Sequence, residues 1–135
     1  MGSIFDGSDN VQPSREARGE TTYLNRLTGT HALTIERAEI SKNGTHVVAE
    51  FEMNGGKVTD LFDLSPKSAR DSWKRDRALA DVRAFVAAAL AIPFAKATQA
   101  RLDEVFTDGS LAGLKVTAIV APNEAGYNRI AYSKA

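Results

Sequence analysis

The chain has 135 residues, of which 43% are hydrophobic and 25% charged, and its formal net charge at pH 7 is zero. That length predicts one globular domain with its own core, and the lack of cysteine excludes disulfides, zinc fingers and thiol nucleophiles. No apolar run approaches the roughly 20 residues that span a bilayer, and the first residues lack the basic-then-apolar form of a secretory signal. We therefore expect a cytoplasmic protein without a membrane partner.

Residues 1–28 are polar, with scattered Gly, Ser, Asp, Asn and Pro and no clear period. This composition predicts a loosely ordered amino-terminal arm. We expect residues 29–135 to form the single folded domain, with Tyr23 and Leu24 leading into it.

Two Asn-Gly pairs join three predicted strands. Asn43 and Gly44 separate the first strand from the second, and Asn54 and Gly55 separate the second from the third. Asn-Gly is typical of a type I′ hairpin turn, because both central residues of that turn need a positive φ. The pattern predicts a three-stranded antiparallel meander over residues 30–40, 45–53 and 57–64.

The apolar residues within these strands indicate which side faces the core. In the first strand they change parity near Glu36 and Arg37, which predicts a β-bulge there. In the third strand, Val58 and Phe62 share one parity with Asp60 between them, so the sequence leaves the buried face of this strand open.

Two helices are predicted after the meander. Ser65 followed by Pro66 is a helix-start signal, and residues 77–91 carry apolar side chains at three- and four-residue spacing. A second helix over about residues 95–106 is expected to stop at Gly109.

Alternating residues predict two further strands at 114–121 and 127–132. Five strands, with one or two helices inserted between strands 3 and 4, predict a mainly β (α+β) domain. Within that class we expect an OB-like barrel, a fold that commonly binds oligonucleotides. A general α+β sandwich is the alternative.

Basic side chains surround the only tryptophan. Cations neutralise phosphates, and an aromatic face offers a base a stacking platform worth about 1–3 kcal/mol. Residues 67–77 are therefore predicted to bind single-stranded nucleic acid. The alternative is an ordinary exposed helix start with the tryptophan packed on the barrel. The candidate binding residues are Lys67, Arg70, Trp73, Lys74, Arg75 and Arg77.

The last predicted strand offers a second candidate surface. If the strand is regular, Tyr127 and Arg129 share a face and Tyr132 lies on the opposite one. One tyrosine is then expected in the core, and Tyr127 with Arg129 is the better binding candidate. Ordinary strand tyrosines are an equally good interpretation.

No pattern favours an enzyme. His31 and His46, on adjacent strands, could face one another, but two histidines without a third ligand make a weak metal site. Glu50 and Glu52 share the wet face of one strand, and no phosphate-binding, nucleophile-elbow or zinc-protease motif occurs. We expect no catalytic residue, metal or cofactor.

Several short motifs, spread in a fixed order over most of the chain, together support a resemblance to a known family. They are MGSIFDG, GTHALTI, AEISKNG, VVAEFEM, ADVRAFVAAAL, LAGLKV and GYNRIAY. With them the chain resembles a family of small phage-encoded proteins (DUF669-like) regarded as single-stranded-DNA-binding or recombination-associated. The resemblance implies an OB-like protein of the host cytoplasm that coats or escorts single-stranded DNA during phage replication or recombination.

The sequence thus predicts a non-enzymatic, sequence-tolerant single-stranded-DNA-binding protein. Its groove is expected to be lined by Lys57, Phe62 and the basic stretch on one side, and by Tyr127 and Arg129 on the other. Self-association and contacts with recombination or replication proteins stay open. The alternative is a non-catalytic protein-interaction module, such as a phage accessory or virion protein that binds a host or phage factor.

Overall fold

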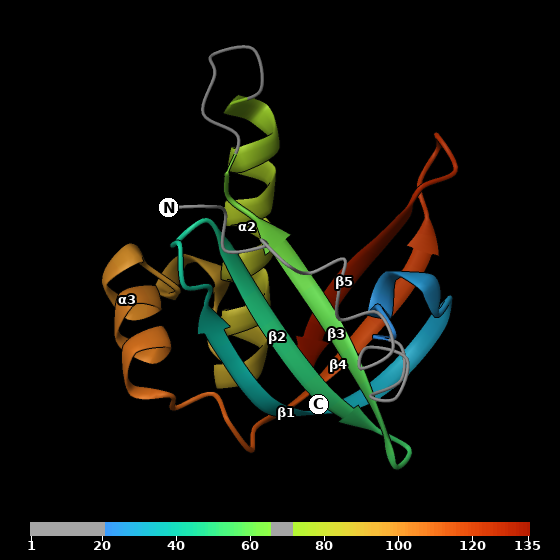
Figure 1. The fold of residues 1–135 in the computed structure, drawn as a ribbon, viewed down its shortest axis with the longest axis horizontal. Helices are drawn as coiled ribbons and strands as arrows, with labels where there is room; N and C mark the ends of the chain where they lie inside the picture. Colours follow the sequence, from blue (N-terminus) through green and yellow to red (C-terminus); the bar gives the residue numbers. More distant parts are fainter. Residues whose placement is uncertain (1–20, 66–71) are drawn as a thin grey trace, which may run out of the picture.

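The computed structural model describes residues 21–65 and 72–135, which form one curled antiparallel sheet and two α-helices (Figure 1). The predicted amino-terminal arm lies largely outside these residues. The described elements, in chain order, are η2 (Leu24–Arg26), β1 (Gly29–Ile40), β2 (His46–Met53), β3 (Gly56–Asp63), α2 (Ser72–Leu90), η4 (Phe94–Lys96), α3 (Gln99–Asp108), β4 (Lys115–Pro122) and β5 (Asn128–Lys134).

The sheet has the strand order β3-β2-β1-β4-β5, with every neighbouring pair antiparallel. The predicted mainly β domain of five strands, with helices between the third and fourth, is confirmed. The predicted closed barrel is wrong, because the edge strands β3 and β5 form no ladder with each other among the described residues.

Local turn chemistry explains one hairpin and corrects the other. Asn54 and Gly55 have φ of 52° and 80°, and Met53 pairs with Gly56, which confirms the type I′ turn. The first connection is a longer loop in which only Gly44 has a positive φ, so the type I′ prediction there is wrong. The Asn43 side chain holds this loop by accepting hydrogen bonds from Thr45.

The predicted bulge in β1 is confirmed, because the β1–β2 register shifts between Ile35 and Arg37. α2 ends at Leu90, and Ala91 follows with a left-handed φ of 55°. The predicted start of this helix at Ser65 and Pro66 cannot be matched to a cap, since residues 66–71 lie outside the described chain.

The second helix, α3, begins later than predicted. Its amino-terminal cap is Thr98, whose hydroxyl accepts from the backbone N–H of Arg101. Gly109 ends it in a left-handed conformation with φ of 70°, as the sequence predicts.

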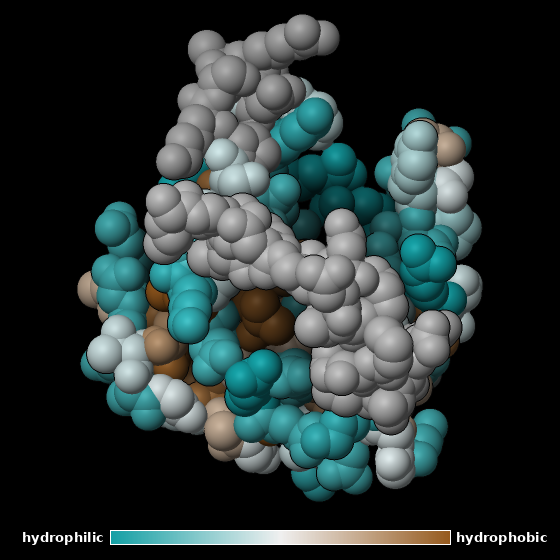
Figure 2. Space-filling view, viewed as in Figure 1, coloured by the Kyte–Doolittle hydropathy of each residue, from teal (hydrophilic) through white to brown (hydrophobic). Residues whose placement is uncertain are grey.

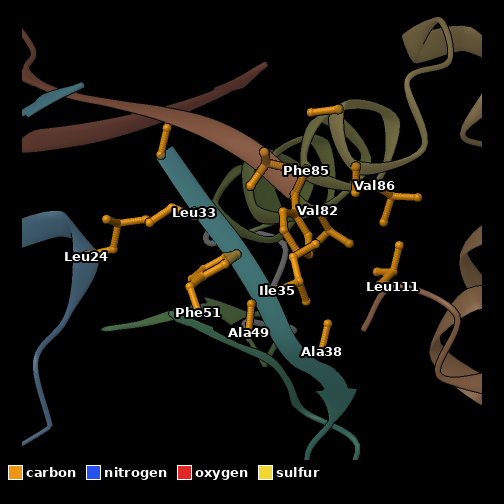
Figure 3. Close-up of a cluster of buried hydrophobic side chains, with 14 of the residues drawn as sticks. Leu24, Leu33, Ile35, Ala38, Ala49, Phe51, Val82, Phe85, Val86 and Leu111 are labelled. Carbon is orange, nitrogen blue, oxygen red and sulfur yellow. The ribbon is translucent and has the colours of Figure 1, made fainter. Parts of the chain in front are cut away.

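The core lies between the sheet and α2 (Figure 3). Phe85 of α2 is fully buried, and its ring lies 5.7 Å from Phe51, 5.7 Å from Phe62 and 5.0 Å from Tyr132. Leu24, which precedes the predicted domain boundary at residue 28, is also fully buried and belongs to this core.

The segment before β1 bridges the two edge strands. The Thr59 N–H of β3 donates to the carbonyl oxygen of Thr22 over 2.9 Å, and Tyr23 forms a parallel bridge with Thr59. On the other side, the Asn128 amide of β5 donates to the carbonyl oxygen of Asn25 over 2.8 Å. The segment before β1 thus bridges one part of the gap between β3 and β5, and side chains line the other part.

Candidate functional site

A cleft of about 280 Å³ lies between β3 and β5, in the part of their gap that the segment before β1 does not bridge. The amino-terminal half of α2 forms its third side. Figure 2 shows hydrophilic side chains gathered in the recess between the amino end of α2 and the projecting β4–β5 hairpin. The residues that line this cleft, the cleft residues, are Asn25, Asp60, Leu61, Phe62, Asp63, Lys74, Arg77, Ala78, Asp81, Asn128, Arg129, Ile130 and Tyr132.

The floor of the cleft is a carboxyl group held by a tyrosine. Strand alternation puts Asp60 on the same side of β3 as the buried Val58 and Phe62. Its Oδ2 accepts the Tyr132 hydroxyl over 2.5 Å, which links the two unpaired edge strands. The third strand therefore buries the face that carries this aspartate.

Burial raises the pKa of Asp60 from 3.8 to about 6. Its hydrogen bonds from Tyr132 and from the backbone of Leu61 oppose that rise, and the nearby Asp81 adds to it. Burial, with the charge of Asp60, also raises the pKa of Tyr132 well above 10. At neutral pH the floor is thus an ionised carboxylate that accepts from a neutral phenol.

The wall of the cleft is one face of α2. Lys74, Arg77 and Asp81 line it at the three- and four-residue spacing that places side chains on the same helical face. Across the cleft, Arg129 Nη2 lies 3.2 Å from Oδ2 and 3.3 Å from Oδ1 of Asp81. This ion pair ties the hairpin to the helix.

Two exposed aromatic side chains are next in sequence to cleft residues. Trp73, next to Lys74 on α2, is 55% exposed, and the Lys74 Nζ lies 5.7 Å from its ring centre. Trp73 is therefore not packed into the core. Tyr127, next to Asn128, is 74% exposed in the turn before β5, whereas Tyr132 packs on the core.

The structure gathers four of the predicted groove residues into the cleft: Phe62, Lys74, Arg77 and Arg129. Phe62 is only 5% exposed, so it contributes an edge and not a stacking face. Trp73 and Tyr127 do not line the cleft, but each precedes a residue that does, Lys74 and Asn128.

The other predicted groove residues lie elsewhere. Lys57 is at the opposite end of β3, where its Nζ lies 3.3 Å from the Glu36 carboxylate. Arg75 lines a separate hollow between α2 and α3, together with Asp76. Lys67 and Arg70 fall outside the described residues.

Sequence reasoning missed the acidic half of the cleft, Asp60, Asp63 and Asp81. For Asp60 a signal was present, because a carboxylate shares the parity of two buried apolar residues on β3. For Asp81 the signal is weak, since one aspartate on a helix that also carries basic residues is ordinarily solvated.

The two histidines, which could have faced one another on adjacent strands, do not do so. His31 pairs with Ala118 of β4, while His46 pairs with Asp63 of β3, and its Nε2 lies 3.3 Å from that carboxylate. Over residues 21–65 and 72–135, no three His, Cys, Asp or Glu side chains gather as metal ligands would.

Within the described part of the chain, no helix is long and apolar enough to cross a membrane. Comparisons with protein families, curated proteins and solved structures gave no match to this chain.

Proposed function

We propose that the protein binds single-stranded DNA across this cleft, without catalysis, as a phage replication or recombination protein of the DUF669-like kind. The observation that carries the proposal is the pair of exposed aromatic side chains, Trp73 and Tyr127, each next in sequence to a residue of a cleft that also contains cations. Exposed aromatic faces near cations offer stacking surfaces to successive bases and positive charge to the backbone between them.

The charge of the cleft limits how strongly phosphates contribute. Arg129 is paired with Asp81, and Lys74 and Arg77 are the other two cationic side chains that line the cleft. Two phosphate contacts on a single strand correspond to a log–log salt slope of about −1.4. We therefore expect affinity to depend on stacking more than is usual for a strongly basic protein.

The strand order supports the same function. A meander β1–β2–β3, a helix, and a β4–β5 hairpin that returns beside β1 is the connectivity of an OB fold. In this protein the edges that would complete the barrel are bridged by η2 and by the Asp60–Tyr132 hydrogen bond. The OB-like assignment is part of the proposal.

The experiment that tests the function is fluorescence anisotropy with a labelled dT oligonucleotide of about 30 nucleotides and its duplex, at 50 and 200 mM salt. We expect the single strand to bind more tightly than the duplex and to weaken with salt. Trp73→Ala should lower affinity by about 1–3 kcal/mol while circular dichroism shows an intact fold.

Phe94→Ala is the matched control, because Phe94 is also an exposed aromatic residue (46%) but lies past the carboxyl end of α2. It should leave binding unchanged. Absence of binding at 50 mM salt would refute the proposal and favour the alternative, a protein-interaction module.

A further inference from the structure

The charges in the cleft are not arranged as a phosphate site would require. Its floor carries the Asp60 carboxylate, and Asp81 and Asp63 line it as well, whereas Lys74 and Arg77 project from the helix wall. A phosphate on the floor would face these carboxylates in a partly buried place, where like charges repel strongly. The backbone of a bound strand is therefore disfavoured at the floor and favoured along the wall.

The floor instead offers a fixed hydrogen-bond acceptor. The Asp60 carboxylate receives the Tyr132 hydroxyl at one oxygen and a hydrogen bond from the backbone of Leu61. An ionised carboxylate has about four acceptor positions, so these two partners orient the group without using all of its capacity. Carboxylates in nucleic-acid interfaces accept from exocyclic amino groups, such as N4 of cytosine.

The size and the walls of the cleft suit one base. Its volume of about 280 Å³ is just below the range of drug-sized ligand pockets, which fits a single ring better than a whole nucleotide. Ile130, Leu61 and the edge of Phe62 supply apolar surface, and the amides of Asn25 and Asn128 lie at its border.

We propose that the cleft takes one base of the bound strand, inserted base-first with its phosphates toward Lys74 and Arg77, and that Asp60 selects a base bearing an exocyclic amino group, with cytosine preferred over uracil. This specificity rests on the proposed single-strand binding. Uracil presents a carbonyl oxygen where cytosine presents an amino group, so it would place an acceptor against the Asp60 acceptor.

Other charged groups near Asp60 fix the conditions of the test. Tyr132 and Arg129 line the cleft from β5, and Asp81, Arg77 and Lys74 line it from α2. Asp63, whose carboxylate lies 3.3 Å from His46, lines it from β3. Since its pKa is raised to about 6, a pH of 7.5 keeps the Asp60 carboxylate ionised and able only to accept. At this pH cytosine is also unprotonated, so dC oligonucleotides do not fold on themselves through protonated cytosine pairs.

The experiment measures anisotropy with labelled dC and dU oligonucleotides of about 12 nucleotides at pH 7.5, using the full chain. These probes differ only at position 4 of the ring and the neighbouring nitrogen. We expect dC to bind about tenfold more tightly than dU, the discrimination of one good base contact. Asp60→Asn should bring the ratio of the two Kd values close to one, since an amide can donate to O4 of uracil as well as accept.

Asp76→Asn is the control of equal charge change, because Asp76 lies on the side of α2 that lines the other hollow. It should keep the tenfold ratio. If neither oligonucleotide binds, the proposed function itself fails. If both bind with equal affinity, or if Asp60→Asn keeps the preference for dC, single-strand binding stands and the assignment of Asp60 is overturned.

Discussion

Replacing Asp60 by Asn should stabilise the fold at neutral pH. Burial makes the ionised carboxylate unfavourable in the folded state, and this is what raises its pKa from 3.8 to about 6. At 1.36 kcal/mol per pKa unit, the rise corresponds to about 3 kcal/mol of free energy of unfolding. The amide of Asn keeps an oxygen that can accept the Tyr132 hydroxyl but carries no charge.

The sign follows from proton linkage. The pKa of Asp60 is higher in the folded than in the unfolded chain, so its contribution to stability is fully present below pH 3.8 and is lost as the pH rises through about 6. Relative to the wild type, Asp60→Asn should therefore gain about 2 to 2.5 kcal/mol between pH 4 and pH 7.5. Any constant difference caused by the amide itself cancels in that comparison.

Urea unfolding followed by far-ultraviolet circular dichroism at both pH values measures the effect. Asp63→Asn is a control of opposite sign on the same strand, because hydrogen bonds from Ser65 lower the pKa of Asp63. The stability due to that carboxylate is present at pH 7.5 and is lost as the pH falls. An Asp60→Asn advantage that stays constant or shrinks toward pH 7.5 would refute the reasoning.

Three further outcomes are expected. Phe85→Ala should lower the free energy of unfolding by about 3–5 kcal/mol in urea titrations, and a loss below 1 kcal/mol would contradict its central place among the core rings. Gly55→Ala should cost about 1–2 kcal/mol because φ is 80° there, whereas Gly56→Ala, without a positive φ, should be tolerated; equal thermal shifts would count against this turn assignment. Reversing Lys74 and Arg77 to Glu should reduce the salt slope of single-strand binding by about 1.4, and an unchanged slope would remove both cations from the interface.

Features set by neighbours in sequence were predictable. The turn at Asn54 and Gly55 follows from the φ values these residue types tolerate, and the bulge near Arg37 follows from a parity change along one strand. Gly109 ends α3 for the same kind of local reason. In each of these cases the physical cause lies within a few residues.

Features that depend on distant partners were not predictable. Barrel closure failed because it requires β3 and β5 to meet, and no local pattern reports the angle between two edge strands. Asp60 and Tyr132 lie 72 positions apart, and Arg129 and Asp81 lie 48 apart, so sequence alone could not pair them. Whether His31 and His46 face one another was likewise open, because adjacency of strands in the chain does not specify the residue that each one pairs with.

The exposure of Trp73 depends both on the local helical pattern and on how far α2 extends past the sheet. The helical period alone does not decide whether the first turn of α2 extends beyond the sheet, and the structure shows that it does. A single tryptophan in a chain this short is more often buried, so composition favoured the wrong side of that choice.

The bridge before β1 also guards the protein against misassembly. An unpaired strand edge presents N–H and C=O groups on which a strand of another molecule can add, which is how many sheet proteins aggregate. Here the Thr59 N–H is already occupied by Thr22, and Asn25 holds Asn128 of the opposite edge. Backbone that spans a seam within one molecule thereby removes part of the template for fibre-like growth between molecules.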